Sequence, residues 1–212
     1  GDILLENNAG TLTVTNASTG TGAIMLSGSG DLALGVASTT GAVNVASTGG
    51  AILDNNSSAL NISGGTVTLS AYNGIETDVN ATTFVSATTT TNNINLEATD
   101  GNLPIGVIST PWSATLKTSV GAITDANAGS LNITANSLVL NSYTAIGALL
   151  DSLEMNISNL SAVSSGGSGV FLGNSGDLNI SGVTASGDFL LNNSGTLSLS
   201  GAVSGSNIDL VT

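Results

Sequence analysis

The chain has 212 residues, with 14 acidic residues, one basic residue and a formal net charge of −13, and it contains no His and no Cys. Charged side chains make up 7% of it, against about 25% in an average globular domain. Without His, Cys or Arg the chain has no imidazole base, no thiolate, no His or Cys zinc site and no guanidinium clamp, so we expect no enzyme. Because Lys117 is the only cation, we also expect no nucleic acid and no anionic membrane surface as a partner.

The mean hydropathy of +0.38 is high, yet no apolar run reaches the ~18 residues that a membrane-spanning helix needs. We therefore expect no membrane insertion. The first ten residues show neither a positive segment nor an apolar segment of a secretion signal, which predicts either a removed signal or an internal piece of a longer chain. The absence of Cys predicts a fold without disulfides, which is compatible with export in an unfolded state.

Short runs of alternating apolar and polar residues follow one another along the chain. Leu, Val and Ile alternate with Ser, Thr and Asn, and Gly or Asn separates the runs, a pattern that predicts half-buried strands joined by tight turns. No amphipathic helical stretch competes with this interpretation. The clearest runs are residues 11–15, 42–47, 60–63, 66–70, 94–98, 131–134, 138–141 and 196–200.

One segment departs from this alternation. Pro104 and Pro111 bracket it, and it ends in Trp112 and Lys117, so we expect a local insertion or a bulged surface loop over residues 104–117. Trp112 is the one conspicuous aromatic side chain of the segment. It is a candidate for stacking on a sugar ring, and the alternative is that it covers the edge of a core.

Internal repetition is the most informative feature of the sequence. The stretch that begins at Ala51 returns without a gap from Ala122, at an offset of 71 residues. Further echoes divide the chain into units near 1–29, 30–99, 100–175 and 176–212, and no cap is recognisable at either end. The pairs that match at this offset include Ile52/Ile123, Asp54/Asp125, Leu60/Leu131, Ile62/Ile133, Leu69/Leu140 and Tyr72/Tyr143.

Regularly spaced short strands are compatible with a sandwich, a propeller or a solenoid, and the scarcity of charge favours the solenoid. In a parallel β-solenoid each side chain lies above its counterpart at ~4.8 Å, where two exposed like charges would repel by roughly 0.9 kcal/mol. We expect one elongated domain of coils of about 20 to 25 residues, roughly nine coils and on the order of 45 Å long. In this register Asn61 and Asn132 point outward, and the core ladder consists of Leu60, Ile62, Val67, Leu69, Leu131, Ile133, Leu138 and Leu140.

The recurring unit from Gly121 to Gly147 and the later stretch from Ser175 to Ser200 resemble the repeat region of filamentous haemagglutinin-like exoproteins of Gram-negative bacteria. The resemblance implies an all-β chain folded as a right-handed parallel β-helix, exported through the outer membrane. It implies a rigid extracellular stalk that serves attachment to host or neighbouring-cell surfaces or glycans, aggregation or biofilm formation. The alternative is a self-assembling fibre or sheath protein whose coils stack end to end through exposed strand edges.

Few residues offer binding or catalytic chemistry. The carboxylates are numerous enough for an acid and base pair, but turn formation and solubility explain them as well. Asp54 and Asp125 are weak calcium candidates, because they recur at one position of the repeat, and bonding of a turn backbone is the alternative. We expect no other cofactor. Thr-rich runs suggest an ice-binding face, but they do not recur in every coil as such a face would require.

Asn-x-Ser/Thr triplets, which can accept glycans, begin at Asn16, Asn56, Asn61, Asn80, Asn132, Asn156, Asn159 and Asn179.

Overall fold

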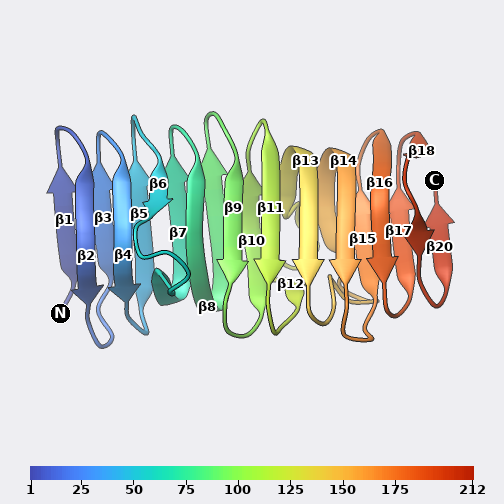
Figure 1. Cartoon of the computed structure of the whole chain (residues 1–212), viewed down its shortest axis with the longest axis horizontal. Helices are drawn as coiled ribbons and strands as arrows, with labels where there is room; N and C mark the ends of the chain where they lie inside the picture. The colour runs from blue at the N-terminus through green and yellow to red at the C-terminus, as the bar shows by residue number, and fades with distance from the viewer.

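Parallel strands stacked in two facing layers make up the chain in a computed structural model that describes residues 1–212 (Figure 1). The chain runs up the rear layer, crosses over the top, runs down the front layer and returns one step further along the axis (Figure 1). This path is a right-handed parallel β-solenoid of about 10 coils, all-β and without a helix, in a single domain. No helical segment suited to crossing a membrane is therefore found.

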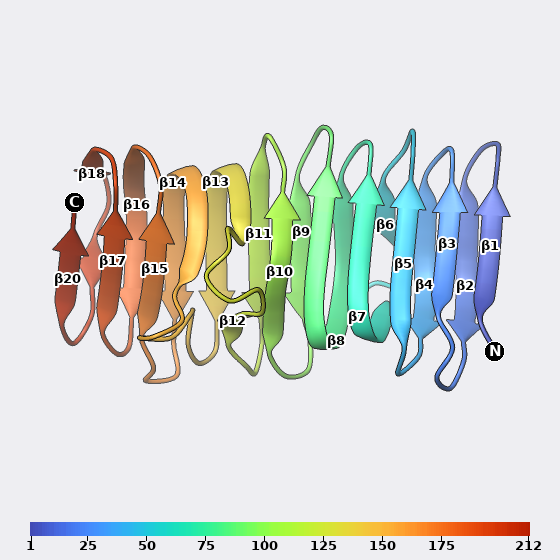
Figure 2. The ribbon, with the colours of Figure 1, turned by 180° about the vertical axis from the view of Figure 1, so that it is seen from behind.

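The layer that faces the viewer in Figure 2 is called layer A, and the layer that faces the viewer in Figure 1 is called layer B. Layer A holds β1 (Ile3–Asn7), β3 (Ile24–Gly28), β5 (Ala42–Ser47), β10 (Leu103–Ser109), β12 (Ile123–Asp125), β15 (Val170–Asn174), β17 (Phe189–Asn193) and β20 (Ile208–Val211). Layer B holds β2 (Leu12–Ser18), β4 (Leu32–Ser38), β6 (Ile52–Asp54), β9 (Ile94–Ala98), β11 (Ser113–Thr118), β16 (Leu178–Ala185), β18 (Leu197–Leu199) and β19 (Val203–Ser204). Four longer strands bend from one layer into the other: β7 (Ile62–Ala71), β8 (Ile75–Thr89), β13 (Ile133–Ser142) and β14 (Leu153–Ser164).

The strand register fixes the length of a coil. Ile24 pairs with Val43, 19 residues later, and Val43 pairs with Val67, 24 residues later. These coils therefore lie within the expected range or one residue below it, and the chain forms about 10 coils rather than nine. At ~4.8 Å per coil the rod is on the order of 48 Å long.

A continuous aliphatic core fills the space between the layers. It contains 46 buried apolar residues in one cluster, and Phe189 is the one aromatic side chain among them. Of the predicted core ladder, Leu60 is only partly buried and Leu131 is 44% exposed, so for these two residues the prediction was wrong. The other six are no more than 1% exposed: Ile62, Val67, Leu69, Ile133, Leu138 and Leu140.

The segment of residues 104–117 is not an insertion or a bulged loop, contrary to the prediction. It forms most of β10, a turn and most of β11, and Ile105, Ile108 and Leu116 are completely buried in the core. Pro104 lies within β10 and pairs with Thr124 of the next coil. The two prolines hide the strand alternation in the sequence, but the apolar residues around them keep their inward positions.

The 71-residue repeat spans three and a half coils. Ile52 pairs in layer B with Ile75, which pairs with Ile94, and Ile94 pairs with Ala114, so three coils end at Ala114. Ile123 follows on the next crossing, in layer A. Residues related by the repeat therefore lie on opposite layers, as the loops beside β6 in Figure 1 and β12 in Figure 2 show.

Candidate functional site

A loop of residues 55–61, here called the first loop, interrupts layer B between β6 and β7. Asp54 organises it, because its Oδ1 atom accepts hydrogen bonds from the Asn56 backbone nitrogen at 2.8 Å and from Asn61 Nδ2 at 2.9 Å. Asn61 Nδ2 also donates to the Leu34 carbonyl oxygen of the preceding coil at 2.8 Å. The Asp54 side chain therefore closes the loop and ties it to the rod.

The second loop, residues 126–132, repeats this arrangement in layer A between β12 and β13. Asp125 Oδ1 accepts hydrogen bonds from the Asn127 backbone nitrogen and from Asn132 Nδ2, both at 2.7 Å. Bonding of the loop backbone, one of the two explanations for the recurring Asp, is thus present in both loops, and calcium binding by Asp54 or Asp125 stays a prediction.

Asn61 and Asn132 are both completely buried, whereas the sequence predicted that they point outward. The physical reason is that each loop breaks the strand alternation, and the adjacent coil presents carbonyl oxygens that need donors where the strand is interrupted. The Asn side chains supply these donors from inside, and Leu60 and Leu131 move toward the surface. Neither buried Asn is accessible to a glycan in the folded chain, whereas Asn156 is exposed.

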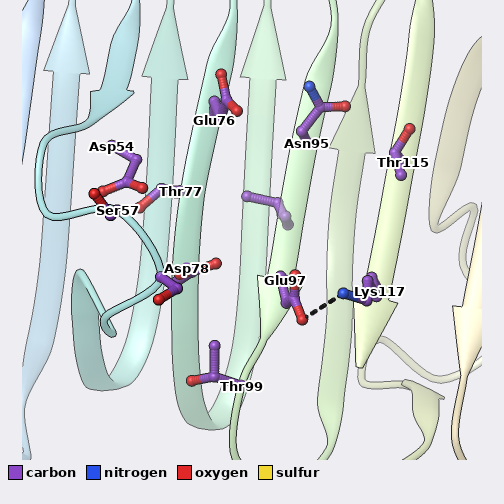
Figure 3. Close-up of a pocket in the computed structure, with 12 residues that line it drawn as sticks. Asp54, Ser57, Glu76, Thr77, Asp78, Asn95, Glu97, Thr99, Thr115 and Lys117 are labelled. Atoms are coloured by element: carbon purple, nitrogen blue, oxygen red, sulfur yellow. Dashed lines mark ion pairs between the residues drawn. The ribbon is translucent and has the colours of Figure 1, made fainter. Parts of the chain in front are cut away.

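A polar groove of about 370 Å³ runs across layer B from the first loop to β11 (Figure 3). One of its 12 lining residues is apolar, and the rest carry carboxylates, hydroxyls, one amide and one ammonium group. The chain positions these groups because β8, β9 and β11 are successive strands of one parallel ladder, so their outward residues line up across the groove. The carboxylates come from Asp54, Glu76, Asp78 and Glu97.

The single cation of the chain lies at the far end of the groove from the first loop (Figure 3). Lys117 Nζ is 2.8 Å from Glu97 Oε1, and the Ser119 hydroxyl donates to the same carboxylate oxygen at 2.7 Å. Partial burial acts to raise the pKa of Glu97, but the hydrogen bonds from Lys117 and Ser119 outweigh it, and the pKa is lowered. Glu97 is therefore held in its charged form, and Lys117 is engaged by it.

Asp78 has the opposite electrostatic environment. Burial, followed by the negative charges of Glu97 and Asp54, raises its pKa above the ordinary value of 3.8. No protein donor forms a hydrogen bond with its carboxylate; its backbone nitrogen donates to Asn61 Oδ1 at 2.8 Å. Asp78 is thus a carboxylate with a surplus of negative charge around it.

Thr77 lies between Glu76 and Asp78 on β8 and is 3% exposed. Its Oγ1 atom is buried and has no hydrogen-bond partner. In Figure 3 its hydroxyl lies on the side of Asp54 and Ser57, at the end of the groove where the first loop covers the strand. Buried hydroxyl groups without a hydrogen-bond partner are rare in folded proteins, so Thr77 is an unusual residue of this chain.

Carboxylates also gather near the second loop. Burial and the neighbouring Asp125 raise the pKa of Asp151. Burial also raises the pKa of Glu154, whose Oε2 atom is buried without a partner. For Asp125, hydrogen bonds from the loop outweigh burial and lower the pKa. No three carboxylates converge on one point here or elsewhere in the chain.

Trp112 lies apart from the groove and from both loops. It is 61% exposed and sits in the turn between β10 and β11, where its carbonyl oxygen accepts bonds from the backbone nitrogens of Asn136 and Ser137. Its ring is therefore not a cover for the core, and its contact with a sugar stays a prediction.

Thr77, Asp78, Glu97 and Lys117 were not predicted from the sequence as members of one site. The signal that identifies the last three is their spacing of 19 and 20 residues, one coil each, which brings Asp78, Glu97 and Lys117 side by side on the outer surface. Carboxylate and hydroxyl oxygens with one engaged ammonium group can bind cations or polar ligands, and they include no activated nucleophile. Comparisons of the chain with protein-family models, with curated proteins and with solved structures find no match.

Proposed function

We propose that the chain is a rigid, non-catalytic stalk segment of a bacterial surface adhesin, located outside the cell. The observation that supports the proposal most is the unbroken parallel ladder of about 10 coils around one aliphatic core. In such a rod each coil is held by backbone hydrogen bonds and by packing to its neighbours, so the structure provides length and stiffness. Attachment to a host or neighbouring-cell surface, or to its glycans, is the role that this stiffness serves.

Immunogold labelling of the producing cells tests the proposed location. Antibodies raised against the folded chain should label intact cells, with the label standing away from the outer membrane. Labelling that appears only after the cells are permeabilised would contradict the proposal. An antibody against a cytoplasmic protein is the control for intact membranes.

Self-assembly into a fibre is the second candidate function. It is supported by the parallel pairing of each coil with the next along the axis, a contact that strands of different chains can also form. Open parallel edges can pair with further strands. Electron microscopy over a range of concentrations separates the two functions, because discrete rods on the order of 48 Å are expected for a stalk and long filaments for a fibre.

A further inference from the structure

Two exposed aromatic side chains lie on the upper edge of the rod in Figure 1: Tyr72 in the turn between β7 and β8, and Trp112 in the turn between β10 and β11. Tyr72 is 51% exposed and Trp112 is 61% exposed. One further turn separates them, because Ser70 pairs with Thr88 and Thr88 pairs with Ser109, each one coil further along. The two aromatic residues are therefore two coils, or about 10 Å, apart along the axis.

Hydrogen bonds hold the backbone of these turns in place. The Tyr72 carbonyl oxygen accepts bonds from the Thr91 backbone nitrogen at 2.9 Å and from the Thr91 hydroxyl at 3.1 Å. The Thr110 hydroxyl, which is buried, donates to the Asn92 carbonyl oxygen at 2.6 Å and accepts from the Trp112 backbone nitrogen at 3.2 Å. The separation of the two aromatic residues is thus set before any ligand binds, which lowers the cost of ordering the site.

A hollow of about 310 Å³ opens on layer B beside this edge, and carboxamide groups line much of it. They come from Asn73, Asn92, Asn93 and Asn95. Asn92 Nδ2 donates to Asn73 Oδ1 at 3.2 Å, and the Ser113 backbone nitrogen donates to Asn93 Oδ1 at 3.2 Å. The Nδ2 atoms of Asn73 and Asn93 donate to no protein acceptor, so these amides have donors left for the hydroxyl groups of a ligand.

We propose that this edge binds a neutral, extended β-1,4-linked glycan, with Trp112 and Tyr72 stacking on sugar rings two apart and the asparagine amides bonding the sugar hydroxyl groups. A pyranose ring presents apolar faces and a polar rim, which aromatic rings and carboxamides complement. One sugar of such a glycan advances by about the rise of one coil, so sugars two apart can reach both aromatic residues. The net charge of −13, with Lys117 engaged by Glu97, disfavours an acidic glycan. The inference rests on the proposed attachment function and names the class of glycan.

Calorimetric titration of the purified chain with cello-oligosaccharides tests the proposal. Cellohexaose should bind saturably and about tenfold or more tightly than cellobiose, because only the longer chain reaches both aromatic residues. Trp112→Ala should weaken cellohexaose binding by about tenfold, and Tyr72→Ala should abolish the advantage of cellohexaose over cellobiose. Tyr143→Ala is the matched control, because Tyr143 is the repeat counterpart of Tyr72, is 54% exposed and follows β13 on the lower edge in Figure 1; it should leave the affinity unchanged.

Unchanged urea denaturation midpoints should accompany all three variants, because each removes an exposed side chain, so a loss of binding would not reflect a loss of folding. Three results would overturn the proposal: no saturable heat up to about 10 mM cellohexaose, unchanged affinity of Trp112→Ala, or tighter binding of a heparin hexasaccharide than of cellohexaose. The binding is measured on the isolated chain, so these results leave the labelling test of surface location unaffected.

Discussion

Replacing Asn61 with alanine removes a fully buried side chain that links two neighbouring coils and the first loop. Its amide nitrogen donates to Asp54 Oδ1 at 2.9 Å and to the Leu34 carbonyl oxygen at 2.8 Å, and its oxygen accepts from the Asp78 backbone nitrogen at 2.8 Å. A hydrogen bond to a charged group contributes about 1.5–3 kcal/mol and a neutral one about 0.5–1.5 kcal/mol. We therefore expect the free energy of unfolding to fall by about 3 to 5 kcal/mol, out of the roughly 5–15 kcal/mol of a typical domain.

Urea denaturation followed by circular dichroism measures this loss, and hydrogen exchange locates it at the Asp78 amide, which should lose its protection. Asn156→Ala is the matched control: it lies in the same Asn-Ile-Ser triplet, but its side chain is exposed, so the expected change is within about 0.5 kcal/mol. Equal denaturation midpoints for the two variants would refute the assignment of Asn61 as the inward-facing link between coils.

Three other substitutions test the register, the corners and the electrostatics. Ile133→Ala should lower the free energy of unfolding by about 2–5 kcal/mol because Ile133 is fully buried, whereas Leu131→Ala, at an exposed position, should change it by about 0.5 kcal/mol or less in urea denaturation. Gly121→Ala should lower the Tm markedly, since a Cβ atom there would collide with the Gly101 carbonyl oxygen, and Gly20→Ala, with open space around it, should not. Folding raises the pKa of Asp78, so the stability that its carboxyl group contributes is lost as the pH rises through the folded pKa. Asp78→Asn should therefore raise the Tm at neutral pH. A rise in Tm that persists below pH 3.8 would contradict this reasoning.

The stacked parallel fold could be predicted from the sequence because every coil of a solenoid must place apolar residues inward and must avoid stacking like charges on its neighbours. Val67, Leu69, Leu138 and Leu140 alternate with polar residues and are buried, as the alternation indicates. For Leu60 and the matching Leu131 the prediction was wrong, since each lies within a loop that resets the alternation, and no local pattern reveals such a reset.

Only part of the candidate site could be predicted from the sequence. Asp54 is visible because it recurs as Asp125 at the repeat offset. The residues that meet it across the groove belong to other coils, so finding them requires the coil length to within one residue. An error of one residue would turn Asp78 inward and Thr77 outward, because successive strand residues point to opposite faces. The hydroxyl of Thr77 has no sequence signal at all, since Thr is common throughout the chain.

The offset of three and a half coils between the two repeat units determines on which faces of the rod a large binding protein can contact the two loops. The first loop opens on one face and the second loop on the opposite face, about 17 Å further along the axis at ~4.8 Å per coil. An antibody that recognises the features shared by both loops would therefore find two epitopes separated by the full thickness of the core. We expect two such antibodies to bind one chain without competition, so that a single rod cross-links its binders from both sides.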